Sequence, residues 1–475
     1  MRIEKIRLDE VKKTYGDIKA LEDISLSLYQ GELLCVAGLS GSGKSVLADI
    51  ISGRTSKGRG RMYVDGRPAV FTSISQAQTA GIFCVRYRTS VINDISVEEN
   101  LCLLQKQGCM SFPARQGIIR MRETLKTLEV DCRLQAPVAS LSLMERHTIE
   151  ICRAFCAGMK VLILDGIARD YTQKETEYMK RLVIRLKEKG ISILWIDTRP
   201  EIMLDAADRL AVLRKLAAVL YREEFDRQMI DRIIIGENRK VGREIIRSQA
   251  DPGGRGMLLS VREVRATELR DVSFHVCPGE VVGFIHPDDT YCREIVRLLS
   301  GELKVESGSA WLAGRQVELA GGRKNMVRYG FGYIEDYKKS LFPKLDVAEN
   351  LTIAGLEYFA PGVGVREKLE QAVACDYLAL LDIREEDLKR PIETLSHRCQ
   401  LNVALYKWII AKARLIVIDN LFSGTDILMR NSVREFLEFA KGRGIGVVYC
   451  SPNESELSSV CDRLYELAEG KVSCK

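Results

Sequence analysis

The sequence lacks the features that mark membrane-spanning, secreted or nucleic-acid-binding proteins. No uncharged run is long enough to cross a bilayer, and the opening segment MRIEKIRLDEVKKTYG has no apolar core of signal-peptide length. The net charge is only +6 for 475 residues, which gives no reason to expect a nucleic-acid partner. We therefore expect a chain that lies in the cytoplasm or on a membrane protein, without inserting into the membrane itself.

Metal-ligand patterns are scarce as well. There are only four histidines, which are scattered, and none of the 14 cysteines forms a Cys-x-x-Cys pair. Cys152 and Cys156 lie one helical turn apart, so a metal pair is conceivable. Both fall on the apolar face of the segment EICRAFCAG, however, which favours core packing. Without a secretion signal, the cysteines are expected to be reduced thiols.

What the sequence does contain is a long internal repeat. The segment ALEDISLSLYQGELLCVAG at residues 20–38 returns as ELRDVSFHVCPGEVVGFIH at residues 268–286. Further along, LILDG at residues 162–166 returns as IVIDN at residues 416–420. Matches that keep the same order over such a distance indicate a duplication.

Length and composition agree with this duplication. At 475 residues the chain exceeds one ordinary core, and its 46% apolar and 29% charged residues are typical of a folded protein. We predict a first domain at residues 1–235, a charged and then Gly/Pro-rich linker at residues 236–256, and a second domain at residues 257–475. Each half alternates short β-branched runs with longer amphipathic segments, which predicts an α/β fold with a mainly parallel sheet covered by helices.

A glycine-rich turn in the first half predicts a phosphate-binding loop. The turn GLSGSGKS at residues 38–45 lies between a predicted buried strand and a predicted helix, and fits Gly-x-x-x-x-Gly-Lys-Ser. Gly41 and Gly43 allow the backbone to wrap a phosphate, and amides at the helix start would point at the anion. Lys44 would neutralise the β- and γ-phosphates, and Ser45 would coordinate magnesium. The alternative, a turn without a ligand, is disfavoured by the complete pattern.

A second motif, KVLILDG at residues 160–166, predicts the magnesium site. Asp165 ends a buried strand, the position that holds Mg²⁺ in nucleotide-hydrolysing sites, and a strand-end acid without a ligand is the less favoured alternative. The next position usually carries the carboxylate that activates water, but here it is Gly166. The sequence therefore predicts ATP and Mg²⁺ as cofactors, Ser45 and Asp165 as metal ligands, and no catalytic residue. The loop residues predicted to bind nucleotide are Gly38, Leu39, Ser40, Gly41, Ser42, Gly43, Lys44, Ser45 and Val46.

These motifs resemble those of the ATP-binding subunit of sugar-import ATP-binding cassette (ABC) transporters of the ribose/galactose/xylose type, in which two cassettes are fused. The resemblance covers nearly the whole chain and also rests on LSLMERHTIEICRAFCAGMKVLILDG, FDRQMIDRIIIGE and LSHRCQLNVALYKWIIAKARLIVIDN. It implies two tandem P-loop NTPase domains, each with a mainly parallel sheet and a helical subdomain. It also implies that each ATP lies between the phosphate loop of one cassette and the signature segment of the other.

The resemblance assigns roles in the first half, where several family residues are replaced. Tyr15 matches the aromatic residue that stacks on adenine, with simple packing as the alternative. The catalytic glutamate corresponds to Gly166, the glutamine at a strand end to Tyr87, and the histidine that senses the γ-phosphate to Thr198. The signature glycine that approaches the nucleotide corresponds to Met144, whose side chain would fill the gap.

The second half departs further from the family. Its segment HPDDTYCRE at residues 286–294 has no Gly-Lys-Ser, and Asp288 and Asp289 would repel a phosphate. Asn420 occupies the position of the catalytic carboxylate. We therefore expect that only the site built on Lys44 binds MgATP.

The signature segment implied to face Lys44 is LSHRC, in the second half. Ser396 and Arg398 are predicted to contribute to the nucleotide site, with His397 and Arg398 in place of the two signature glycines. Arg398 would either reach a γ-phosphate and replace the lost amides by charge, or remain solvated as arginines at helix starts more often do.

The resemblance leaves two functions open. The first is the ATP-binding subunit of a carbohydrate import system, peripheral at the inner face of the cell membrane. Its partners would be integral-membrane permease subunits and, through them, a sugar-binding protein, with docking between Tyr87 and Glu99 and before Glu349. The second is a non-hydrolysing pseudo-ATPase with a regulatory or signalling role. Tandem cassettes that act on ribosomes are disfavoured, because those resemble two intact cassettes joined by a long charged helical linker.

Overall fold

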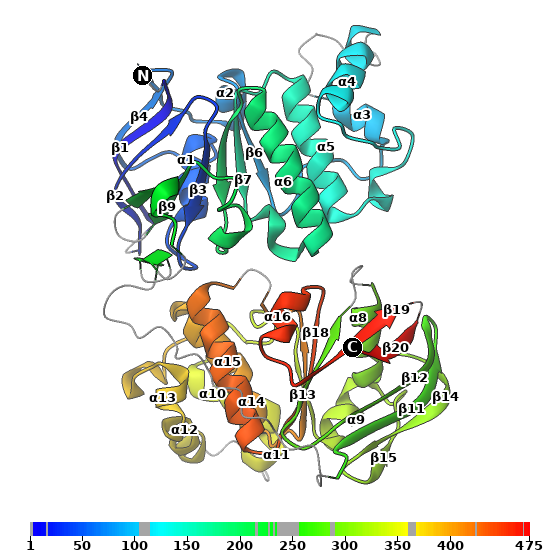
Figure 1. The fold of residues 1–475 in the computed structure, drawn as a ribbon. Coiled ribbons are helices and arrows are strands. Elements are labelled where there is room, and N and C mark those ends of the chain that lie inside the picture. The colour runs from blue at the N-terminus through cyan, green and yellow to red at the C-terminus, as the bar shows by residue number, and fades with distance from the viewer. Residues whose placement is uncertain are drawn as a thin grey trace. The chain divides into compact units, whose positions relative to one another are not determined.

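The computed structural model divides the chain into two compact units, Met1–Val241 and Gly242–Lys475 (Figure 1). The predicted linker at residues 236–256 lies outside the described residues except for Gly256, so its boundaries stay a prediction. The residues that the structure describes are 3–15, 18–103, 115–213, 217–226, 229–230, 233–234, 256–285, 290–359, 367–422, 425–468 and 470–475.

The first unit contains two sheets. A four-stranded antiparallel sheet has the order β2-β1-β4-β5, and a six-stranded sheet has the order β10-β9-β3-β8-β7-β6. In the six-stranded sheet every neighbouring pair is parallel except β9 with β10. Strands β3, β8 and β9 are buried at every residue, as is typical of a parallel sheet covered on both faces. The strands are β1 (Glu4–Tyr15), β2 (Ile18–Tyr29), β3 (Leu33–Ala37), β4 (Arg59–Val64), β5 (Arg67–Pro68), β6 (Ile82–Arg86), β7 (Val161–Asp165), β8 (Ser192–Ile196), β9 (Arg209–Leu213) and β10 (Ala217–Tyr221).

Helices surround these sheets and form a separate group at one end of the unit. In that group α3 and α4 pack on α5, as Figure 1 shows. Helix α5 begins after Ser142, whose side chain and that of Glu145 cap each other's backbone amides, which explains the sharp start. The helices are α1 (Lys44–Ile51), α2 (Ile74–Thr79), α3 (Val97–Cys102), α4 (Arg115–Thr127), α5 (Leu143–Cys156) and α6 (Gln173–Glu188), with short 3-10 turns η1 (Val138–Ser140), η2 (Ile167–Asp170), η3 (Pro200–Ile202) and η4 (Arg222–Glu224).

The second unit repeats this topology, as the duplicated sequence predicts. Its sheets have the orders β12-β11-β14-β15 and β16-β17-β18-β13-β19-β20, which are those of the first unit strand for strand. The fold class predicted from sequence is therefore confirmed. The strands are β11 (Leu259–Ala266), β12 (Leu269–Val276), β13 (Val281–Ile285), β14 (Val305–Leu312), β15 (Arg315–Val317), β16 (Phe331–Ile334), β17 (Leu415–Asp419), β18 (Gly446–Ser451), β19 (Arg463–Ala468) and β20 (Lys471–Cys474).

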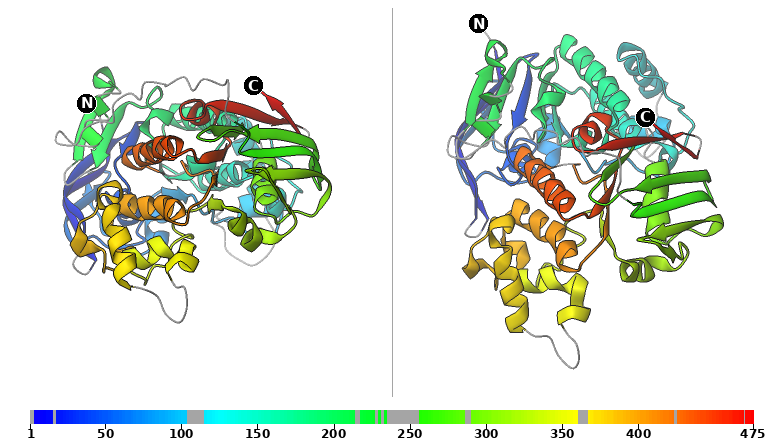
Figure 2. Two further views of the ribbon diagram at one scale, coloured as in Figure 1. Left: turned by 90° about the horizontal axis from the view of Figure 1, so that it is seen from below. Right: turned by 60° about the horizontal axis from the view of Figure 1, so that its bottom comes forward.

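Within the second unit, the antiparallel sheet and the small helices α10 to α13 lie on opposite sides of the parallel sheet (Figure 2). The helices are α8 (Thr290–Leu299), α9 (Gly322–Tyr329), α10 (Val347–Thr352), α11 (Leu356–Phe359), α12 (Glu367–Asp376), α13 (Leu378–Leu381), α14 (His397–Ile410), α15 (Ile427–Gly442) and α16 (Glu454–Ser458), with 3-10 turns η5 (Ile353–Gly355), η6 (Glu385–Asp387) and η7 (Ile392–Thr394).

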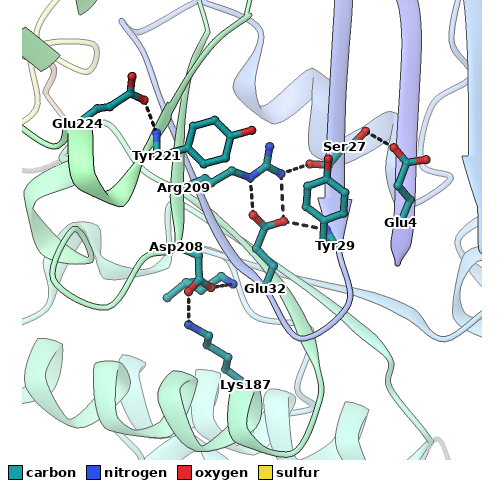
Figure 3. Close-up of polar contacts among 10 residues, drawn as sticks. Glu4, Ser27, Tyr29, Glu32, Lys187, Asp208, Arg209, Tyr221 and Glu224 are labelled. Carbon is teal, nitrogen blue, oxygen red and sulfur yellow. Dashed lines mark hydrogen bonds and ion pairs between the residues drawn. The ribbon is translucent and has the colours of Figure 1, made fainter. Parts of the chain in front are cut away.

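A buried ion pair joins the two sheets of the first unit (Figure 3). Arg209 at the start of β9 pairs with Glu32, which precedes β3, and both side chains are 5% exposed. Arg209 also donates to the carbonyl of Ser27 on β2, and Glu32 accepts from the backbone amide of Tyr29. Because Nε and Nη2 of Arg209 and both carboxylate oxygens of Glu32 have partners, the network compensates much of the cost of burying two charges.

The second unit contains the same network. Arg463 pairs with Glu280 at 3.0 Å and donates to the carbonyl of His275 at 2.8 Å. Here the arginine and glutamate side chains are 24% and 17% exposed. The duplication therefore preserves this ion-pair network, although its two charged side chains are more exposed to solvent than those of the first unit.

Membrane-spanning helices and cysteine thiols can be assessed for the described residues only. No helix among them is long and apolar enough to cross a bilayer. The cysteines among them form no disulfide bonds in the structure. Cys152 and Cys156 are buried in the core, where the thiol of Cys156 lies 3.2 Å from the hydroxyl of Thr124, as their predicted packing role requires.

Candidate nucleotide-binding site

The predicted phosphate loop connects the buried strand β3 to helix α1. Gly38, Gly41 and Gly43 have φ angles of 153°, 82° and 90°, a region that favours glycine. A Cβ at Gly43 would lie 2.3 Å from the carbonyl oxygen of Ala20, so only glycine fits there. A Cβ at Gly41 would meet nothing within 4 Å, because this glycine borders open space. The loop thus combines a fixed backbone with room for a ligand.

Lys44 is the first residue of α1 and closes the loop on itself. Its ammonium group donates to the carbonyl oxygens of Gly38 at 2.7 Å and Leu39 at 2.8 Å, and the residue is 8% exposed. The charge is therefore held at the centre of the loop, where it faces any phosphate bound by the helix-start amides. The remaining predicted loop residues lie along this turn, with Val46 half-buried against the core of the unit.

Ser45 and Asp165 are brought together as predicted for metal ligands. The hydroxyl of Ser45 donates to the carboxylate of Asp165 at 3.1 Å. Burial raises the pKa of Asp165, while the nearby Arg86 and the Ser45 hydrogen bond act in the opposite direction. A hydroxyl and a half-buried carboxylate are hard oxygen donors of the type that Mg²⁺ prefers, so the residues present fit this ion.

Arg86 is a charged neighbour that the sequence did not reveal. It ends β6, pairs in register with Asp165 on β7, and places its guanidinium 3.6 Å from the Asp165 carboxylate. The same guanidinium forms an ion pair with Asp49 on α1. Arg86 lies beside Asp165 because β6 and β7 pair in parallel, and a linear sequence motif contains no information about strand pairing.

His147 was also missed, since its sequence context suggests only a helix. It is fully buried on α5 and contacts the hydroxyl of Tyr171 at 2.7 Å and the carbonyl of Arg86 at 2.9 Å. Burial lowers the pKa of His147. The imidazole therefore fixes the end of β6 beside the site.

The three positions that the resemblance matches to the family's catalytic groups are Gly166, Tyr87 and Thr198. Gly166 has φ 63°, and its amide donates to the carbonyl of Ile196 at 2.9 Å. The hydroxyl of Tyr87 bonds to Asp170, on the turn that follows Gly166. Thr198 is half-buried at the end of β8. None of the three provides a carboxylate.

Tyr15 ends β1 and is 48% exposed, with the ammonium group of Lys13 5.0 Å from its ring centre. An exposed aromatic ring is accessible for stacking on a base. Its predicted contact with adenine stays a prediction.

Ser396 and Arg398 belong to the second unit. Ser396 caps α14 and accepts from the amide of Cys399 at 3.2 Å. Arg398 donates to the hydroxyl of Ser432 at 2.9 Å and to the carboxylate of Asp382 at 3.1 Å. Its guanidinium is thus positioned by two side chains of its own unit, through Nε and Nη1.

The segment of the second unit that matches the phosphate loop in the repeat can be described only in part. Asp288 and Asp289 lie outside the described residues, and α8 begins at Thr290. Asn420 has φ 44°, and its amide donates to the carbonyl of Cys450 at 2.8 Å. This is the backbone arrangement of Gly166 in the first unit.

The fold and the first site define a protein of the phosphate-loop nucleotide-binding class, built from two copies of one module. The chain belongs to the ABC transporter family, whose profile, described as ABC transporter, matches residues 21–168 and 269–423. Membership implies cassettes that bind ATP.

The chain is similar over nearly its whole length to curated proteins. The ribose import ATP-binding protein RbsA of Jannaschia sp. (strain CCS1) is 27% identical, and the alignment covers 99% of this chain and 92% of that protein. A putative ribose/galactose/methyl galactoside import ATP-binding protein of Burkholderia cenocepacia (strain HI2424) is 30% identical, with coverage of 99% and 92%. A solved ATP-binding cassette of an ABC transporter, in its ADP conformation, is 23% identical with a TM-score of 0.44 and covers 50% of this chain and 96% of that one.

Proposed function

We propose that the chain is the ATP-binding subunit of a carbohydrate import system, and that it binds MgATP at one composite site with weak or absent hydrolysis. The observation that carries this proposal is the first phosphate loop, in which Lys44 is centred and Ser45 contacts Asp165. The sugar-import names of relatives that align over nearly the full chain support the carbohydrate role.

The proposal that hydrolysis is weak or absent rests on the lack of a side chain that could act as the general base. A general base must lie within hydrogen-bond reach of the attacking water, and it typically contributes about a hundred- to ten-thousand-fold in rate. Gly166 has no acceptor in its side chain, and the Tyr87 hydroxyl is bonded to Asp170. Bound Mg²⁺ would neutralise phosphate charge, with Ser45 and Asp165 as its protein ligands.

A regulatory pseudo-ATPase is the second candidate, and the missing carboxylate at Gly166 favours it. The two roles differ in the partner. A permease gene beside this one supports transport, whereas a neighbouring sensor kinase or regulator without a complete permease supports signalling. In either role the composite site would pair Lys44 with the segment containing Ser396 and Arg398.

We expect one MgATP per chain, because only the first half has a complete phosphate loop. Lys44→Ala should abolish binding by removing the charge at the centre of that loop. Calorimetric titration of the full chain measures both stoichiometry and affinity, with the exposed Lys189→Ala as the control. Two sites per chain, or one site that survives Lys44→Ala, would contradict the proposal.

Two matched apolar side chains favour the predicted docking region for a permease. Ile92 and Phe342 are 46% and 51% exposed, and they occupy equivalent positions in the two units. In each unit a buried asparagine bonds to both the amide and the carbonyl of this residue, Asn100 with Ile92 and Asn350 with Phe342. The backbone is therefore fixed so that the apolar side chain faces outwards, which suits a protein interface.

With a permease co-expressed as the candidate partner, we expect Ile92→Asp and Phe342→Asp to reduce co-purification by about tenfold or more, since each places a charge in an apolar contact. Val70→Asp, at a residue that is 65% exposed elsewhere on the first unit, is the matched control. Unchanged co-purification of both variants would exclude these two residues from the interface.

A further inference from the structure

A guanidinium group lies close to the position at which the family has its catalytic carboxylate. If residue 166 had a side chain, its Cβ would have one heavy atom from elsewhere in the structure within 4 Å, Nη2 of Arg169 at 4.0 Å. Gly166 directly follows Asp165, which contacts Ser45 of the phosphate loop. The space beside the predicted magnesium site is therefore bordered by the positive charge of Arg169.

Several contacts hold Arg169 in this place. Its guanidinium lies 5.2 Å from the centre of the Tyr87 ring, in a cation–π arrangement. Tyr87 is anchored in turn by its hydroxyl bond to Asp170 and by its amide, which donates to the carbonyl of Asp165 at 3.3 Å. The side chain that replaces the family's glutamine thus supports this arginine.

Arg199 fixes the backbone of the same turn. This residue is 7% exposed and follows Thr198 at the end of β8. It donates to the carbonyl of Ala168 at 2.6 Å and to that of Arg169 at 3.3 Å. The turn that carries Arg169 is therefore fixed by Tyr87, which follows β6, and by Arg199, which follows β8.

The chemistry of a guanidinium at this point differs from that of a base. Arginine has five N–H donors and no acceptor, and it stays protonated, so it cannot take a proton from water. It is well suited to bind a phosphate through charge-assisted hydrogen bonds. The repeat position in the second half is Ser423, so the feature belongs to the first half alone.

We propose that Arg169 binds the γ-phosphate of ATP and makes the site discriminate ATP from ADP, so that it senses uncleaved nucleotide. This inference rests on the proposed nucleotide binding at the Lys44 loop. ADP lacks the group that Arg169 would contact, and therefore its affinity should not depend on this residue.

The test compares the affinities of the full chain for MgATP and MgADP by calorimetry. We expect the wild type to prefer ATP by about tenfold or more, the effect of one charge-assisted hydrogen bond. Arg169→Gln should lower the ratio by about tenfold or more without changing ADP affinity, and Arg169→Lys should keep part of the preference. Arg181→Gln, an exposed arginine on α6, controls for the loss of one positive charge.

The outcomes separate this inference from the proposal on which it depends. An unchanged ATP-to-ADP ratio in Arg169→Gln overturns the role of Arg169, as does an equal loss of both affinities, which would indicate a structural effect. ATP binding that does not require Lys44 instead overturns the proposed nucleotide site itself. Unchanged ADP affinity in the variant also shows that the site is still folded.

Discussion

Replacing Glu32 with alanine is expected to destabilise the first unit by about 3–5 kcal/mol. Glu32 and Arg209 are each about 5% exposed, so the substitution leaves a guanidinium charge buried without its carboxylate (Figure 3). It also removes the acceptor for the amide of Tyr29. An unpaired buried charge costs far more than the net stabilisation that an intact pair provides.

The duplicated network provides the control for this prediction. Glu280→Ala removes the equivalent carboxylate, but the pair it forms with Arg463 is 17–24% exposed. Water can then solvate the remaining arginine, and the loss should be clearly smaller. Urea titration followed by hydrogen exchange of peptides from each unit measures both stabilities. Equal losses for the two variants would show that burial does not determine the cost.

The α/β fold class and the strand–turn–helix segment that carries the phosphate loop could be predicted from sequence because both are indicated by local patterns. A buried β-branched run followed by a glycine turn and an apolar helix specifies a strand, a loop and a helix start. The repeat extended the fold-class prediction, but not the phosphate loop, to the second half, and the matching strand orders confirm the shared fold.

The surroundings of the site could not be predicted in the same way. Arg86 approaches Asp165 because β6 and β7 pair in register, and Arg169 approaches Gly166 because a turn places them together. Neither relation is present in a linear motif. Arg398 shows the same limitation, since its partners Asp382 and Ser432 come from distant parts of the second half.

The wild-type chain is expected to bind ATP but to release phosphate at or near background. Restoring the base alone, as Gly166→Glu, should raise the rate of hydrolysis only slightly, because the other groups that orient the water are still missing. The structure adds two further reasons. Residue 166 has φ 63°, where a residue with a side chain pays about 1–2 kcal/mol. The new carboxylate would also lie beside the guanidinium of Arg169, which would attract it and lower its pKa, making it a weaker base.

A combined variant should exceed any single change, because groups that orient one water molecule act as a unit and their effects are not additive. We expect it to recover at least about tenfold of the hundred- to ten-thousand-fold that a missing base costs. The measurement is steady-state phosphate release, with Lys44→Ala as the blank for contaminating activity. The substitutions to combine are Gly166→Glu, Tyr87→Gln, Thr198→His, His397→Gly and Arg398→Gly. Rapid wild-type turnover that disappears in Lys44→Ala would show that the site uses another base, and weak hydrolysis would no longer be part of its function.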